Sequence, residues 1–142
     1  MSYLSATGYS RDMLSGDAYG MLARDPESTL IDVRTQAEWA YVGVPDLSLG
    51  KATLFSEWQS YPSMQVDERF VARLSTMLEM AGVKHGAPLL FICRTGVHAR
   101  HAAAAMTAGG WAPCFNVSDG FEGPLNPRHP RSAIVIERLR FC

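Results

Sequence analysis

Short apolar runs alternate with amphipathic segments along this chain. The runs at 29–33, 87–92 and 113–117 have the length and composition of buried β-strands. The segment at 67–82 repeats apolar residues three and four positions apart, which is the spacing of one helix face, and Gly82 supplies its C-terminal stop. This alternation favours an α/β fold with a mainly parallel sheet and helices on its faces.

Residues that can cap helices predict where two further helices begin. Ser15 is a candidate N-cap for a helix that runs to about Arg24. Thr35 is followed three positions later by Glu38, a capping-box pattern that predicts a short helix after the first strand. The segment 51–58 alternates weakly between apolar and polar residues and predicts a further strand.

One cysteine lies at the junction between a strand and a helix. The run at 87–92 is continuously apolar, as expected for a central parallel strand that is covered on both faces. An alanine-rich helix begins near residue 97 and ends at Gly109 and Gly110. Cys93 therefore lies at the carboxyl end of a central strand, where open α/β sheets bind their ligands.

This junction can favour an anionic sulfur. Backbone N–H groups at the start of a helix lack internal partners, and with the helix dipole they attract negative charge. Gly96 permits left-handed backbone angles in the loop, and Arg94, His98 and Arg100 add positive charge close to Cys93. A buried cysteine usually acts only as a small apolar side chain, but the basic and glycine neighbours favour a nucleophile here.

The composition is that of a globular protein, and the net charge does not indicate a binding partner. The chain has 142 residues, of which 47% are hydrophobic and 19% charged, and a formal net charge of −1, so we expect one globular domain over residues 1–142 and no nucleic-acid partner. No secretory signal or membrane-spanning run is found, which predicts a cytoplasmic protein. Cys93, Cys114 and Cys142 do not fit a disulfide framework, so each is expected to be a free thiol.

Three separated motifs resemble the rhodanese family. The sequence CRTGVHA at 93–99 is similar to the family's active-site loop, and LIDVRTQAEWAYVGVPDL at 30–47 is similar to its first characteristic segment. The sequence FNVSDGFEGPLN at 115–126 resembles the segment after its penultimate strand. The resemblance covers roughly residues 10–126, and it leaves the role of the tail at 127–142 open.

This resemblance implies a three-layer α/β/α domain with about five strands, and a sulfurtransferase activity. Cys93 would accept a sulfane sulfur from thiosulfate or another persulfide donor and pass it to cyanide, a thiol or a protein acceptor. Asp32 and Arg34 would form a structural ion pair or brace the loop. The implied donor-binding residues are the rest of the loop and its continuation, namely Arg94, Thr95, Gly96, Val97, His98, Ala99 and Arg100.

The loop departs from the family pattern at two positions. His98 and Ala99 stand where many members have an arginine followed by serine or threonine. Because a histidine is only partly charged near neutral pH, weaker thiosulfate binding and a different natural donor are expected.

Two other functions remain open. Cysteine phosphatases and the related arsenate reductases need an arginine six positions after the cysteine, but Ala99 is there and Arg100 falls one place later. A non-catalytic rhodanese-like module that binds a protein partner is the second alternative, although such a module would not need Cys93. No cluster of acidic and histidine residues suggests a metal, and we expect no cofactor.

Overall fold

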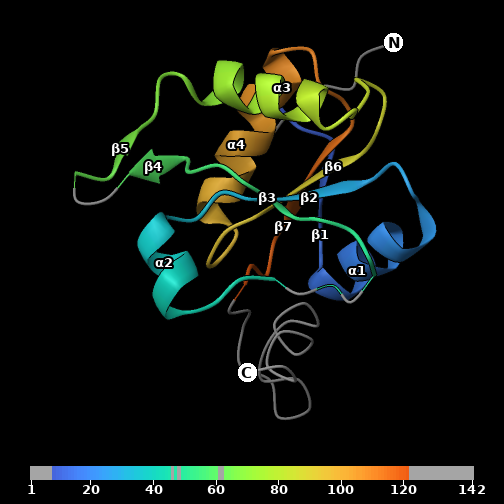
Figure 1. The fold of residues 1–142 in the computed structure, drawn as a ribbon, viewed down its shortest axis with the longest axis horizontal. Helices are drawn as coiled ribbons and strands as arrows, with labels where there is room; N and C mark the ends of the chain where they lie inside the picture. Colours follow the sequence, from blue (N-terminus) through green and yellow to red (C-terminus); the bar gives the residue numbers. More distant parts are fainter. Residues whose placement is uncertain (1–7, 46, 48, 61–62, 122–142) are drawn as a thin grey trace.

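A computed structural model describes residues 8–45, 47, 49–60 and 63–121 of the chain (Figure 1). The tail at 127–142, with Cys142, and the end of the third resembling motif lie outside these residues. The predictions made for them are therefore not tested by the structure.

A five-stranded parallel sheet forms the centre of the described residues. Its strands lie in the order β1-β7-β6-β2-β3, and every neighbouring pair is parallel. The strands are β1 (Arg11–Met13), β2 (Thr29–Asp32), β3 (Leu54–Phe55), β6 (Leu89–Ile92) and β7 (Cys114–Val117). The predicted α/β fold with about five mainly parallel strands is confirmed.

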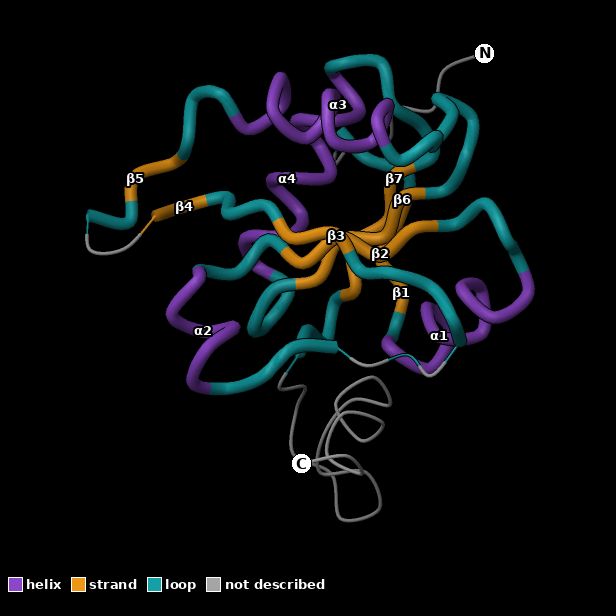
Figure 2. Tube along the Cα trace, viewed as in Figure 1, coloured by secondary structure: helices purple, strands orange, loops and turns teal. Residues whose placement is uncertain are grey.

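Helices cover both faces of this sheet, as the tube view shows (Figure 2). Helices α3 (Phe70–Met80) and α4 (Val97–Ala108) bury their apolar faces on one side, and α1 (Ser15–Arg24) buries its apolar face on the other. The short helix α2 (Gln36–Tyr41) lies on the side of α1. The arrangement has the three layers that the family resemblance implied.

The central strands are buried along their whole length. All four residues of β6 and all four of β7 are buried, which explains why these runs are continuously apolar rather than alternating. Successive side chains of β6 enter opposite layers: Phe91 packs under α3 and α4, and Ile92 packs under α1. Cys93 continues this alternation and returns to the layer of α3 and α4.

The capping box predicted for α2 is confirmed. The Glu38 N–H donates to Thr35 Oγ1 at 3.3 Å, and the Thr35 N–H donates to Glu38 Oε1 at 3.1 Å. The long amphipathic helix α3 starts at Phe70, three residues later than its predicted start at Asp67. Asp67 instead forms a turn before the helix, where its Oδ1 accepts the Arg69 N–H at 2.9 Å.

The prediction that Ser15 caps α1 is wrong. Ser15 is the first residue of the helix, and the N-cap is Leu14, whose side chain makes no capping hydrogen bond. The carboxylate of Asp119 takes the capping role from 104 residues away, because it accepts both the N–H and the hydroxyl of Ser15. Helix α1 thus begins where the fold supplies an acceptor for its first N–H group.

Short edge strands are the elements that the hydrophobic pattern did not reveal. Strand β1 has two exposed residues out of three, so no apolar run marks it. The predicted strand at 51–58 is reduced to β3, and the chain then forms a small antiparallel pair of β4 (Gln59–Ser60) and β5 (Gln65–Val66). Strands β1 and β3 pair with β7 and β2, which lie far away in the sequence, whereas β4 and β5 pair with each other.

Replacement of Leu74 by alanine will test the layer beneath α3. Leu74 is 0% exposed in the core cluster, so its truncation leaves a cavity and is expected to lower the free energy of unfolding by about 2–5 kcal/mol. Met80→Ala on the same helix is the control, because Met80 is 84% exposed and its loss should change stability little. Urea unfolding measures both, and equal effects of the two substitutions would contradict this packing.

Candidate active site

The candidate site lies at the carboxyl ends of three neighbouring strands. Cys93 directly follows β6, Asp32 is the last residue of β2, and Ser118 directly follows β7. Because β6 pairs with both β2 and β7, the segments that leave these strands emerge side by side. This is the position at which parallel sheets bind ligands.

Two backbone N–H groups point at the sulfur of Cys93. Gly96 N lies 3.0 Å from Cys93 Sγ, and Ala99 N lies 3.3 Å from it. Gly96 is the N-cap of α4, so the first turn of this helix faces the sulfur as well. Cys93 is only 3% exposed. The sulfur is therefore held in a small cradle of donors, an environment that stabilises negative charge on it.

Three further N–H groups of the loop have no acceptor within the described part of the chain. The N–H groups of Thr95, Val97 and His98 make no hydrogen bond there, as expected before and in the first turn of a helix. The side chains of Thr95, Val97, His98 and Arg94 are exposed. The loop thus presents free N–H groups together with exposed side chains, two of them basic, next to the buried sulfur.

The loop fits tightly against the segment that follows β7. Gly96 has a φ of +91°, and a Cβ on it would overlap the carbonyl oxygen of Ser118. Gly120 has a φ of +68°, and a Cβ on it would overlap the carbonyl oxygen of Arg94. Phe121 N–H donates to the carbonyl of Cys93 at 2.6 Å. Both glycines are needed here because two backbones approach closely in left-handed conformations.

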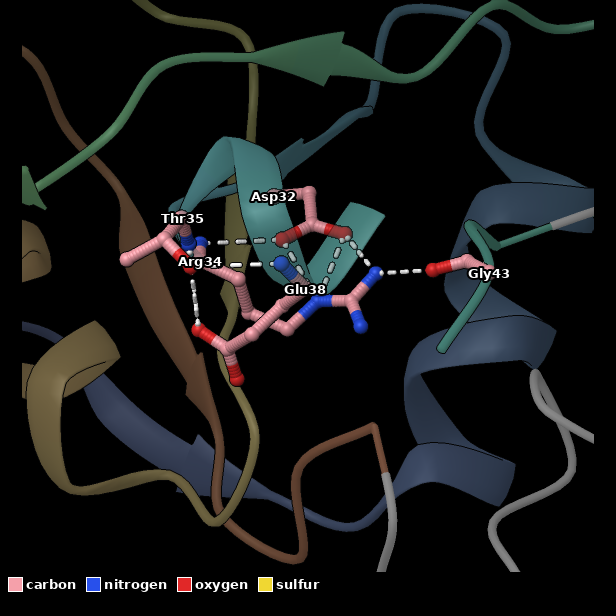
Figure 3. Close-up of polar contacts among 5 residues, drawn as sticks. All are labelled: Asp32, Arg34, Thr35, Glu38 and Gly43. Atoms are coloured by element: carbon pink, nitrogen blue, oxygen red, sulfur yellow. Dashed lines mark hydrogen bonds and ion pairs between the residues drawn. The ribbon is translucent and has the colours of Figure 1, made fainter. Parts of the chain in front are cut away.

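A buried ion pair between Asp32 and Arg34 lies next to the end of this segment (Figure 3). Arg34 Nη2 lies 2.8 Å from Asp32 Oδ2, and both side chains are almost fully buried. Arg34 Nη2 also donates to the carbonyl of Gly43 at 2.7 Å. Its guanidinium carbon lies 3.9 Å from the centre of the Phe121 ring. Asp32 orients Arg34, and Arg34 packs on the residue that bonds to the Cys93 carbonyl, so the pair lies where a brace for the loop would be.

Arg100 lies in different surroundings from the rest of the loop. It lines a cavity of about 220 Å³ together with Tyr9, His101 and Ala104. The pKa of Tyr9 is raised mainly by burial and also by the hydrogen bond from the Tyr9 hydroxyl to Asp12. The positive charge of Arg100 opposes this rise. The structure places Arg100 beside Tyr9, and its proposed contribution of charge at Cys93 stays a prediction.

The second described cysteine differs from Cys93. Cys114 is buried in the core, and its thiol donates to the carbonyl of Trp111 at 3.2 Å. Burial raises the pKa of Cys114 to about 11, so this thiol stays protonated near neutral pH. Cys93 and Cys114 are both free thiols, as expected from the sequence.

The described residues hold no group of three or more histidine, cysteine, aspartate or glutamate side chains placed to bind a metal ion. Within the same residues, no helix has the length and apolar character that a membrane crossing requires.

Sequence reasoning did not identify the segment 118–121 as part of the site. It supplies backbone contacts to Gly96 and Arg94 and a hydrogen bond to Cys93. The glycine at position 120, within a motif that resembled the family, was a usable signal, because a glycine after a buried strand often marks a close backbone approach.

Replacement of Gly96 by alanine will test the fit between the two backbones. The Cβ adds both left-handed strain, about 1–2 kcal/mol, and an overlap with backbone that cannot rotate away. Gly110→Ala is the matched control, because Gly110 has a φ of +98° but nothing within 4 Å of a Cβ. Urea unfolding should show a larger loss for Gly96→Ala, and equal losses would mean that only the backbone angle matters.

Comparisons with known proteins agree with this architecture. Residues 15–125 match the model of the rhodanese-like domain. Uncharacterized proteins of Rickettsia conorii and Rickettsia prowazekii are each 34% identical over 113 residues, which are 80% of this chain and 85% of theirs.

Solved structures show the same fold. Rv0390 from M. tuberculosis is 35% identical and has a TM-score of 0.72, over 94% of this chain and 95% of its own. A polysulfide-sulfur transferase homodimer from Wolinella succinogenes is 24% identical, with a TM-score of 0.55, over 84% of this chain and 76% of its own. The motifs, the parallel sheet and the family match agree: this chain belongs to the rhodanese-like domain family.

Proposed function

We propose that this protein is a rhodanese-type sulfurtransferase in which Cys93 carries the transferred sulfur as a persulfide. The observation that supports this proposal most directly is the pair of N–H groups, from Gly96 and Ala99, directed at Cys93 Sγ. Nucleophilic attack by sulfur requires the thiolate, and converging N–H donors stabilise that anion. A cysteine with only a packing role has no need of such donors.

The reaction has two transfers. The Cys93 thiolate attacks the outer sulfur of a donor such as thiosulfate, and an S–S bond to Cys93 forms while the S–S bond of the donor breaks. Sulfite leaves with the electron pair, so that Cys93 holds a persulfide anion. A thiophilic acceptor, such as cyanide or a thiolate, then attacks the outer sulfur, and the electron pair of the broken S–S bond restores the Cys93 thiolate.

The loop supplies hydrogen-bond donors for the anions in both steps. The N–H groups of Thr95, Val97 and His98 have no hydrogen-bond acceptor among the described residues, so they are free to bind the oxygens of thiosulfate or the outer sulfur of the persulfide. These groups are fixed by the helix start and need no rearrangement when charge arrives. Because Cys93 is 3% exposed, the group that reaches its sulfur must be small or slender.

The natural donor is proposed to carry less negative charge than thiosulfate. The basic side chains exposed on the loop are Arg94 and His98, and histidine is only partly charged near neutral pH. A persulfide or another small donor with a single negative charge needs less positive charge than a dianion. The acceptor is proposed to be a thiol, either of a small molecule or of a protein.

Phosphatase chemistry is less well supported by the geometry. A phosphatase needs an arginine side chain that clamps the phosphoryl oxygens, but the position six residues after Cys93 is Ala99, which is buried in the core. Arg100 lines the cavity beside Tyr9. A non-catalytic binding module is also less well supported, since it leaves the donors around Cys93 Sγ without a purpose.

A reducing compartment fits this proposal, because Cys93 and Cys114 are both free thiols. We therefore propose a cytoplasmic location, where the Cys93 thiol remains available to react.

The sulfur-carrying residue can be identified by mass spectrometry. After incubation with thiosulfate or glutathione persulfide, the protein should gain one sulfur that cyanide removes. Cys93→Ser should abolish this gain, and Cys114→Ser should retain it because Cys114, with a pKa of about 11, stays protonated. A sulfur found on another cysteine would overturn the assignment. Failure with thiosulfate, mercaptopyruvate and glutathione persulfide alike would favour the non-catalytic module.

Replacement of His98 by arginine tests the proposed choice of donor. The permanent charge should lower the KM for thiosulfate by about 3–10-fold, the range that one added exposed charge interaction supplies. Steady-state kinetics with thiosulfate and with glutathione persulfide measure the change, which should be smaller for the persulfide. His101→Arg is the control, because His101 lines the cavity beside Tyr9. An unchanged or higher KM for thiosulfate would contradict the role given to position 98.

A further inference from the structure

The segment 118–121 packs against the loop that follows Cys93. Its Phe121 N–H donates to the Cys93 carbonyl at 2.6 Å, and the backbones at Gly120 and Ser118 are in close contact with those at Arg94 and Gly96. These contacts reach the loop on either side of the turn that aims the Gly96 N–H at the sulfur. A shift of this segment would therefore shift the N–H groups that face Cys93 Sγ.

One carboxylate fastens this segment to another layer of the protein. Asp119 Oδ1 accepts the Ser15 N–H at 2.9 Å, and Asp119 Oδ2 accepts the Ser15 hydroxyl at 2.7 Å. Ser15 is buried and begins α1, so the carboxylate also lies at the positive end of a ten-residue helix. Both oxygens of Asp119 thus accept from Ser15, which lies 104 positions away, and neither hydrogen bond is with the loop after Cys93.

We propose that Asp119 is a positioning residue for sulfur transfer, a role that rests on the function proposed above. It fixes the segment 118–121 to the start of α1, and this segment in turn holds the N–H groups of Gly96 and Ala99 on Cys93 Sγ. Donors that stabilise a reacting anion lose much of their effect when they are displaced by a fraction of an ångström to an ångström.

Other anchors limit the size of the expected effect. The Ser118 N–H donates to the Met13 carbonyl at 2.9 Å, and the Gly120 N–H donates to the Val117 carbonyl at 3.0 Å. Arg34 packs on the ring of Phe121. Because these contacts remain when Asp119 is changed, we expect the site to be loosened rather than lost, with a fall in rate of about tenfold.

The test compares Asp119→Ala with Asp17→Ala. Alanine removes the charge and both acceptor oxygens, so both bonds to Ser15 are lost. Asparagine is not used, because its Oδ1 can accept the Ser15 N–H and its Nδ2 can donate to the Ser15 hydroxyl. Asp17 is an exposed carboxylate in the first turn of the same helix, so its alanine variant loses the same charge at the same helix end. Any effect of the lost charge alone appears in both variants.

Two measurements are made at a temperature at which both variants are folded. The first is the single-turnover rate of persulfide formation at saturating donor, which should fall about tenfold in Asp119→Ala and stay unchanged in Asp17→Ala. The second is the NMR position of the Gly96 and Ala99 backbone amide signals, which should move in Asp119→Ala only. Ser15→Ala, which removes the hydroxyl bond and keeps the N–H bond, should give a smaller change of both kinds.

The outcomes separate this inference from the proposed function. If Asp119→Ala keeps the wild-type rate and amide signals while losing stability, Asp119 only caps the helix and the proposal is wrong. If the wild-type protein forms no persulfide, the proposed function fails, but the amide signals still decide whether Asp119 positions the loop. Should Asp119→Ala not fold, Ser15→Ala decides the question by the same two measurements.

Discussion

The hydrogen bond from Gly96 to Cys93 Sγ is the interaction on which the arrangement of the site depends. For its N–H to face the sulfur, residue 96 must have a positive φ and lie in contact with the backbone at Ser118. Only glycine meets both conditions without strain. The next donor, the Ala99 N–H, follows from the first because α4 begins directly after Gly96. One backbone angle therefore sets both the start of the helix and the donors around the sulfur.

A buried charge pair contributes to the same geometry. Removing two charges from water is costly, and a buried ion pair adds little net stability unless its bonding groups are satisfied. Asp32 accepts both the Arg34 backbone N–H, at 3.0 Å, and its guanidinium, and the guanidinium also bonds to Gly43. The hydrogen-bonding groups of the pair are thus satisfied, and the Arg34 guanidinium packs on the ring of Phe121, whose N–H bonds to the Cys93 carbonyl.

Most of the layer order and the location of the sulfur could be predicted from the sequence, because these depend on patterns within single segments. The buried runs of β6 and β7 and the capping box at Thr35 are local signals that the structure confirms. The cap of α1 could not be found in this way. Its acceptor, Asp119, belongs to another part of the chain, and only the closed sheet brings it to Ser15.

The edge of the sheet and the surroundings of Arg100 were also beyond local reasoning. Strand β1 is stabilised by pairing with β7, which is about 100 residues away, and its own residues are mostly exposed. Proximity in sequence places Arg100 near Cys93, and the direction of a side chain on its helix decides which neighbours it meets. Adjacent helical residues point about 100° apart, so the residue after the buried Ala99 faces a different neighbour, here Tyr9.

The same geometry explains why a substitution is tolerated differently at positions 98 and 99. The N–H of Ala99 donates to Cys93 Sγ, and the Ala99 side chain is fully buried in the core, away from any bound sulfur compound. His98 is exposed at the start of α4, where a side chain can change without disturbing the core. Charge on the loop can therefore be adjusted at position 98 while the cradle stays fixed. In the proposed sulfurtransferase, this division would let one backbone arrangement serve sulfur donors of different charge, because the peptide groups would bind the sulfur and the exposed side chains would select its donor.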